Sequence, residues 1–167
     1  MKLTNEELNI LGILEENHSL SSKSIAMQLA MTEENVQKIV KKLENEKIIV
    51  SYPTLIDWNK IEGKEMIVAM IDVKVTPQRS VGFNEVAEQI YRNPEVTSLY
   101  LMSGTYDLSV TVEGKTMKEI ALFVSNKLAT IENVVSTTSH FMLKKYKHDG
   151  FIVEGNDDKD RRMVISP

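Results

Sequence analysis

The chain has 167 residues, of which 42% are hydrophobic and 26% are charged, with a net charge of -4 and no cysteine. These values are ordinary for a globular protein, and they exclude a disordered or fibrous chain, a disulfide framework and any site built on a thiolate. The negative net charge argues against nonspecific coating of nucleic acid, although a local basic patch can still bind it.

No part of the sequence resembles a membrane or export signal. No apolar run approaches 18 residues, and the chain opens with polar residues, so we predict neither a membrane span nor a signal peptide. The absence of cysteine fits a reducing compartment. We therefore expect a cytoplasmic protein that does not contact a membrane.

Helical spacing dominates the first 60 residues. Thr4 to Glu7 forms a capping box, so a helix should span residues 5–17. Its predicted buried stripe consists of Leu8, Leu11 and Leu14. A serine cap at Ser21 or Ser22 predicts a short helix over residues 23–29, and Thr32 caps a third helix over residues 33–46. Because only three residues separate the last two helices, they must cross sharply, as in a helix-turn-helix. The β-branched run 47–52, which ends at Pro53, predicts a wing strand.

The third helix has a basic face opposite its apolar stripe. Lysines there can contact phosphates, and asparagine or glutamine can read base edges. The candidate DNA contacts are Ser22, Lys23, Thr32, Asn35, Gln37, Lys38, Lys41, Lys42 and Lys47. An alternative interpretation is a solvated helix stabilised by pairs such as Glu34 with Lys38, each contributing about 0.2–0.5 kcal/mol.

From about residue 66 the hydrophobic period changes to two. The predicted elements are strand 66–75, helix 81–92, strand 96–103, strand 106–112, a helix that begins after Thr116, and strand 134–143. The order β-α-β-β-α-β predicts a ferredoxin-like four-stranded antiparallel sheet with both helices on one face. Both alternating sets of side chains in the first two strands are largely apolar, so we expect a partner subunit to cover the second face.

A tight hairpin is predicted at Gly104 and Thr105, because glycine suits the first central position of a type II′ turn. This structural role alone could explain the glycine. Asp107 follows on the polar side of the next strand, beside a backbone that no side chain shields. An exposed amide and a nearby carboxylate could hold the carboxylate and ammonium groups of an amino acid.

Nothing in the sequence predicts an enzyme. The three histidines, at 18, 140 and 148, have no spacing that matches a metal site, and no glycine-rich phosphate loop is present. We therefore expect no catalytic residues, no metal and no cofactor.

Taken in order, these motifs resemble the Lrp/AsnC (feast/famine) family of transcriptional regulators. The residues that carry the resemblance are Leu3-Thr4, Glu7, Ile13-Leu14, Glu16-Asn17, Ile25-Ala26, Val40 to Glu44, Ile48-Ile49, Gly104, Tyr106-Asp107-Leu108, Ile131-Glu132, Val134 and Thr137-Thr138. Three positions depart from the family pattern. Ala30 and Lys47 stand where glycine is common, and Ile39 stands where arginine is frequent.

The resemblance implies an α+β protein: an N-terminal winged helix-turn-helix followed by a ferredoxin-like (RAM-type) domain. The expected boundaries are 1–50 for DNA binding, 51–65 for the wing and hinge, 66–147 for dimerisation and effector binding, and 148–167 for a C-terminal extension. In the extension, 151–153 and 163–165 could add edge strands, and 156–162 should be mobile. The implied function is regulation of transcription on double-stranded DNA by a homodimer that can assemble to an octamer.

The resemblance also implies a small amino-acid effector. The implied effector contacts are Ser103, Gly104, Thr105, Tyr106 and Asp107, joined by Thr137, Thr138 and Ser139. A different function stays open on the sequence alone: a winged-helix module for protein contacts, with neither an effector nor DNA sequence specificity.

Overall fold

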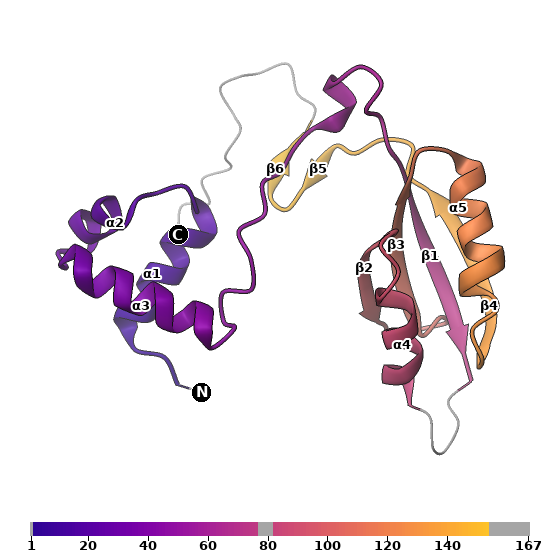
Figure 1. The fold of residues 1–167 in the computed structure, drawn as a ribbon, viewed down its shortest axis with the longest axis horizontal. Helices are drawn as coiled ribbons and strands as arrows, with labels where there is room; N and C mark the ends of the chain where they lie inside the picture. The colour runs from indigo at the N-terminus through magenta and orange to yellow at the C-terminus, as the bar shows by residue number, and fades with distance from the viewer. Residues whose placement is uncertain (1, 77–81, 154–167) are drawn as a thin grey trace. The chain divides into compact units, whose positions relative to one another are not determined.

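The computed structural model describes residues 2–76 and 82–153 (Figure 1). The chain divides into two compact units, one that extends to Ile56 and one that starts at Asp57. Within the described part, no helix is long and apolar enough to cross a membrane.

Three helices build the first unit: α1 (Asn5–Glu16), α2 (Ser22–Leu29) and α3 (Glu33–Asn45). The predicted capping box at the start of α1 is confirmed, since the Thr4 amide donates to Glu7 Oε2 at 2.8 Å and the Glu7 amide donates to Thr4 Oγ1 at 3.3 Å. Ser21 caps α2 and Thr32 caps α3 in the same way. The cluster that joins the helices is centred on Ile10, Ile25, Ala26 and Val36, all buried.

The predicted buried stripe of α1 is partly wrong: Leu14 packs against the core as predicted, but Leu8 does not. Leu8 is 52% exposed, whereas Glu7 and Ile10 are buried, with Ile13 and Leu14 packed beside them. The reason is a contact that the sequence pattern does not reveal. A lysine of α3 binds the Glu7 carboxylate, and this turns α1 so that its Glu7 side faces the other helices.

Two of the residues that depart from the family pattern lie in left-handed backbone. Ala30, directly after α2, has φ 52°, and Lys47, two residues after α3, has φ 58°. Each ends its helix: the amide of Met31 donates to the carbonyl of Ala26, and the amide of Ile48 donates to that of Leu43. Glycine is favoured at such positions because it has no Cβ to crowd the carbonyl.

Lys47→Gly should therefore raise the free energy of unfolding of the first unit by about 0.5–1 kcal/mol, which is the strain relieved less the extra freedom that glycine has in the unfolded chain. The matched control is Lys47→Ala, which removes the same charge and keeps the Cβ. Urea denaturation followed by circular dichroism measures the difference. Equal stability of the glycine and alanine variants would contradict this account of the helix end.

The predicted wing strand over residues 47–52 is wrong, because the structure has no strand there. The amides of Ile48 and Ile49 both donate to the carbonyl of Leu43, at 2.9 and 3.2 Å, so they complete the end of α3 instead of entering a ladder. The Tyr52 hydroxyl donates to Glu44 on α3 at 2.9 Å. A β-branched run with no pairing strand beside it does not form a sheet.

The second unit is a four-stranded antiparallel sheet in the order β2-β3-β1-β4, as predicted. Its elements are the 3₁₀ turn Trp58–Lys60, β1 (Ile67–Val75), α4 (Phe83–Tyr91), β2 (Val96–Leu101), β3 (Leu108–Gly114), α5 (Met117–Phe123), the π-helical turn Val124–Leu128, and β4 (Val134–Phe141). A two-stranded ribbon follows, made of β5 (Lys147–His148) and β6 (Phe151–Ile152).

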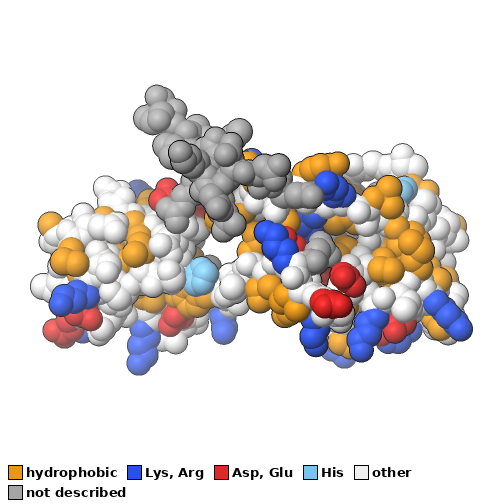
Figure 2. All heavy atoms as spheres, turned by 90° about the horizontal axis from the view of Figure 1, so that it is seen from above, with side chains coloured by type: hydrophobic (Ala, Val, Ile, Leu, Met, Phe, Trp, Pro, Cys, Tyr) orange, Lys and Arg blue, Asp and Glu red, His pale blue; other side chains and the backbone are white. Residues whose placement is uncertain are grey.

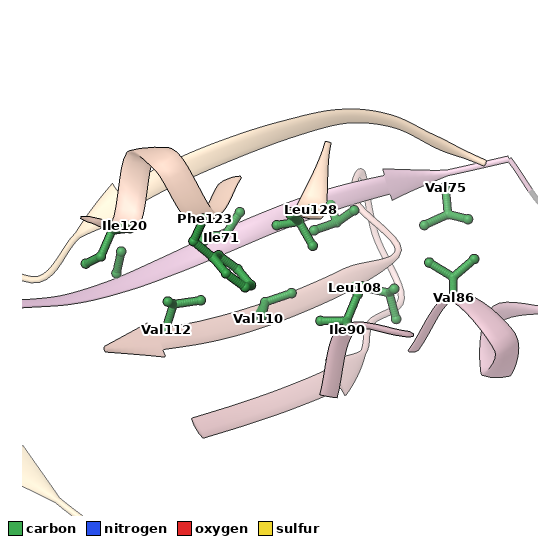
Figure 3. Packing of buried hydrophobic residues seen from close by; sticks show 12 residues of the cluster. Ile71, Val75, Val86, Ile90, Leu108, Val110, Val112, Ile120, Phe123 and Leu128 are labelled. Carbon is green, nitrogen blue, oxygen red and sulfur yellow. The ribbon is translucent and has the colours of Figure 1, made fainter. Parts of the chain in front are cut away.

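The core of this unit lies between the sheet and its two helices. Ile71, Val110 and Leu108 point from the sheet toward Ile90 of α4 and Phe123 of α5 (Figure 3), and all five side chains are buried. These residues occupy every second position of β1 and β3, so the period of two in the sequence places them on one face. Residue 81, which the sequence placed in the first helix, lies outside the described part.

The opposite face of the sheet, called here the open face, carries no helix. Directly paired residues share a face, so the register places Met70, Tyr100 and His140 there. Met70 is 46% exposed and Tyr100 is 60% exposed. Apolar side chains reach the surface of this unit in Figure 2. This is the second face that the sequence predicted to be uncovered, but it is less apolar than predicted, because the register also places Asp72, Thr111 and Thr138 there.

The predicted two-residue hairpin at Gly104 is wrong. β2 ends at Leu101 and β3 starts at Leu108, and the Met102 amide donates to the Asp107 carbonyl at 2.8 Å. Residues 103–106 therefore form a four-residue loop, called here the hairpin loop. The strands separate early because Asp107 turns to β1: its amide donates to the Val73 carbonyl at 3.0 Å. Gly104 still has a positive φ, 155°.

The first predicted strand of the extension is present. Phe151 and Ile152 pair with His148 and Lys147 in the ribbon, within the chain itself. The second predicted strand, 163–165, and the run 156–162 lie outside the described residues.

Candidate functional site

One face of α3 is exposed and rich in amide and ammonium groups. Gln37, Lys38, Lys41 and Asn45 follow one another at helical spacing and are all exposed, whereas Val36 and Leu43 on the other side are fully buried. Lys38 pairs with Glu34 at 2.7 Å, with side chains 70% and 75% exposed, and Lys41 has no ion pair within the described chain. Such an exposed pair contributes little to stability, so Lys38 can exchange it for a phosphate.

Lys42 is also exposed, its side chain to 46%, but unlike Lys41 it is held in an ion pair with α1. Its ammonium binds Glu7 Oε1 at 2.7 Å, and Glu7 is only 5% exposed. The Lys42 ammonium, followed by the Thr4 amide, holds the pKa of Glu7 below its usual value. A lysine that neutralises a buried carboxylate cannot leave it cheaply. The structure therefore gives Lys42 a contact between α1 and α3, and its predicted role in DNA binding stays a prediction.

The Glu7–Lys42 pair makes the stability of the first unit depend on pH. Because the pKa of Glu7 is lower in the folded chain, its contribution is complete above the ordinary value of 4.5 and is lost as the pH falls below it. We expect thermal melts to show wild type more stable than Glu7→Gln at pH ~7, and the gap to narrow at pH ~3.5. If the difference in stability between wild type and Glu7→Gln did not change with pH, a charge-based role for Glu7 would be contradicted.

The remaining candidate DNA contacts lie at the ends of the helices. Ser22 and Lys23 are in the first turn of α2, and Asn35 is exposed in the first turn of α3. The Thr32 hydroxyl accepts from the Asn35 amide at 3.3 Å, so it serves as a cap. Lys47 is exposed at the left-handed end of α3. Ile39, where arginine is frequent in the family, packs partly buried against the helical core.

The hairpin loop presents unbonded backbone amides. Among the described residues, none of the four amides of residues 103–106 donates a hydrogen bond. Ser103, Gly104 and Thr105 are exposed, and a Cβ built on Gly104 would contact nothing within 4 Å. Consecutive free amides are a suitable binding site for a carboxylate.

Asp107 fastens this loop to β1. Its Oδ2 accepts from the Val75 amide at 2.9 Å, and its carboxylate pairs with Lys74 at 3.2 Å while being only 19% exposed. The Val75 amide, and to a lesser extent Lys74, lowers the pKa of Asp107 against the opposing effect of desolvation, so the carboxylate stays ionised. Both oxygens are thus occupied within the chain. Asp107 positions the loop, a role that differs from the free ligand-binding carboxylate that the sequence suggested.

Of the three predicted effector contacts on β4, only one contacts the hairpin loop. The Tyr106 hydroxyl and the Thr138 hydroxyl are 2.8 Å apart. Thr138 pairs with Asp72 on the open face, whereas Thr137 and Ser139 pair with Val73 and Ile71, which face the helices. Hence Thr138 joins the site, and Thr137 and Ser139 lie on the other side of the sheet.

A cleft opens beside the base of the hairpin loop. It has a volume of about 420 Å³ and lies between α4 and β2. Leu101 and Leu108, the pair that closes the hairpin, line it together with Phe83, Tyr91 and Leu99. The cleft is therefore apolar at the base of the loop, and it lies on the helix side of the sheet, opposite to the face that carries Thr138.

The sequence reasoning missed two residues of this site, Lys74 and Val75. Both lie at the end of β1, opposite Asp107, and contact it through a side chain and an amide. A lysine inside a mostly apolar strand was a usable signal for the first. The Val75 amide has no signal in the sequence, since only the register of β1 against β3 brings it to Asp107.

Known proteins resemble this chain over both of its units. The family model described as the Lrp/AsnC ligand binding domain matches residues 68–151. The chain is 56% identical to the uncharacterized HTH-type transcriptional regulator YugG of Bacillus subtilis, and the match covers 100% of both chains. It is 33% identical to the HTH-type regulator PF1231 of Pyrococcus furiosus, over 80% of this chain and 86% of that one.

Solved structures agree with the fold. The regulator NMB0573 of Neisseria meningitidis, solved as its L-Met complex, superposes with a TM-score of 0.70 at 24% identity and covers 88% of this chain and 94% of its own. AsnC of E. coli gives a TM-score of 0.69 at 18% identity, with coverage of 89% and 97%. At these identities the agreement concerns the fold alone.

Proposed function

Because the chain belongs to the Lrp/AsnC family of helix-turn-helix transcriptional regulators, we propose that α3 binds double-stranded DNA and that the second unit binds an amino-acid effector. Residues 1–50 read the DNA, 51–65 connect the units, and 66–147 self-associate and sense the effector. Such a regulator acts in the cytoplasm and has no catalytic role.

The exposed face of α3 carries the DNA-binding part of the proposal. Gln37 and Asn45 offer amides for base edges, and Lys38 and Lys41 offer ammonium groups for phosphates. The buried opposite face holds α3 against α1 and α2, which leaves the polar face free to enter a major groove. A two-fold dimer would present two such helices, so its operator should have half-sites separated by about 34 Å or a multiple of it.

A salt titration tests this part. If lysines of α3 and the adjacent helix ends neutralise phosphates in a dimer, log K against log salt should fall with a slope of roughly -4 or steeper. Fluorescence anisotropy of a labelled duplex measures K at each salt concentration. A slope near zero would instead favour the alternative function, a helix-turn-helix module for protein contacts.

The effector part of the proposal is supported by the free amides of residues 103–106 and by the cleft at the base of the same hairpin, which Leu101 and Leu108 line. The solved relative from Neisseria meningitidis binds L-Met. We therefore propose that this chain binds an amino acid with an apolar side chain, its carboxylate on the loop amides and its side chain in the cleft. A thermal-shift screen against the twenty amino acids tests this proposal. It would be overturned if only amino acids with charged side chains stabilised the protein.

Self-association is proposed to occur through the open face, where Met70 and Tyr100 are exposed. Dimers could assemble further, to an octamer, and the effector would act by favouring one arrangement of dimers over another. This mechanism requires unequal affinity of the effector for the two assemblies. Light scattering with and without the effector measures the mass, and a monomer under both conditions would contradict the proposal.

A further inference from the structure

The β5–β6 ribbon concentrates positive charge in an acidic chain. Residues 141–153 contain Lys144, Lys145 and Lys147 against Asp149, a net charge of +2, whereas the whole chain has -4. The remaining residues therefore carry -6. Lys145 and Lys147 form no salt bridge with any described residue, and Lys144 lies 5.0 Å from the centre of the Tyr146 ring.

The ribbon has the geometry of a true two-stranded hairpin. His148 pairs with Phe151, Lys147 pairs with Ile152, and the Val153 amide donates to the Tyr146 carbonyl at 3.0 Å. Its turn consists of Asp149 at φ 44° and Gly150 at φ 83°, the Asp-Gly pair that a type I′ turn favours. The turn matches the natural twist of the strands and holds Lys147 in β5, and Lys145 lies shortly before this strand.

A ribbon this short is marginal by itself, and its strand residues stay exposed, while Lys145 just before it is half-buried. Tyr146 is 66% exposed and Phe151 is 43% exposed. Lysines that alternate with an exposed tyrosine are suited to a phosphate backbone, because ammonium and phenol groups both donate to phosphate oxygens. A two-stranded ribbon also has the width that a DNA groove accepts.

We infer that the β5–β6 ribbon is a second DNA contact, in addition to α3, and that it binds phosphates without reading sequence. This inference rests on the proposed DNA-binding function. It assigns the lysines at 145 and 147 to phosphate contacts that release counterions on binding. Since these contacts are independent of base identity, they raise the affinity for all duplexes equally.

The test compares Lys145→Gln/Lys147→Gln with wild type in the full-length chain, by anisotropy on a labelled duplex of arbitrary sequence. Losing two phosphate contacts per chain should make the salt slope less steep by about 1.8 per chain, or about 3.6 for a dimer. The matched control, Lys115→Gln/Lys118→Gln, removes the same charge from two exposed lysines that precede and open α5. Lys145→Arg/Lys147→Arg should keep the wild-type slope.

The outcomes separate the two proposals. If wild type shows no salt-dependent binding, DNA binding itself fails. If wild type binds and the ribbon variant keeps its slope, or changes it no more than the control does, the ribbon inference alone is overturned. Circular dichroism melts of each variant show whether the chain is folded. If the double variant does not fold, the single variant Lys147→Gln replaces it, and half the change in salt slope is then expected.

Discussion

Replacing Lys38 and Lys41 together with alanine should weaken binding to every DNA sequence by roughly 4,000-fold at about 0.1 M salt. Each phosphate contact releases about 0.9 counterion, which corresponds to roughly eightfold in affinity at that salt concentration. A dimer would lose four such contacts. Both side chains are exposed on α3, away from the helical core, so the fold should be unaffected.

Two further variants serve as controls for the α3 variant. Lys115→Ala/Lys118→Ala removes the same charge and should change the affinity little. Lys42→Ala should lower the melting temperature, because it leaves the buried Glu7 carboxylate without its partner. A gel-shift or anisotropy titration in which the α3 variant retains wild-type affinity would remove α3 from the DNA interface.

Asp107→Ala should abolish the effector-induced thermal shift, whereas Asp107→Asn should keep a reduced shift. Asparagine retains an oxygen that can accept from the Val75 amide, so the hairpin loop stays fastened to β1. Alanine leaves that amide and Lys74 without a partner. At 100 times Kd an effector stabilises the fold by about 2.7 kcal/mol, and a hundredfold loss of affinity would leave only about 0.4 kcal/mol.

This pair of variants separates two roles for one carboxylate. If Asp107 positions the loop, asparagine and alanine differ as stated. If Asp107 binds the ammonium group of the effector directly, both variants lose the shift equally, and the proposed positioning role is wrong. Light scattering should give wild-type mass for both variants. A full shift in Asp107→Ala would place the effector outside this loop.

Local signals in the sequence determined the elements of this protein. The capping residues Thr4, Ser21 and Thr32 each begin a helix where predicted, because a side-chain oxygen that accepts from an amide two or three residues later acts within one turn. The period of two placed Ile71 and Val110 in the core, because alternation along a strand needs no knowledge of its neighbours. Helix-turn-helix and sheet order followed from connection lengths and handedness.

Only the tertiary structure decided which charged side chains are free. Lys41 and Lys42 are neighbours in sequence and identical in chemistry, yet Lys41 has no ion pair within the described chain, whereas Lys42 neutralises Glu7, 35 residues away. Asp107 likewise looked like a free carboxylate until β1 brought Lys74 and the Val75 amide to it. Whether an ion pair forms depends on distances between elements, and these are set by the packing of the core, which no local pattern encodes.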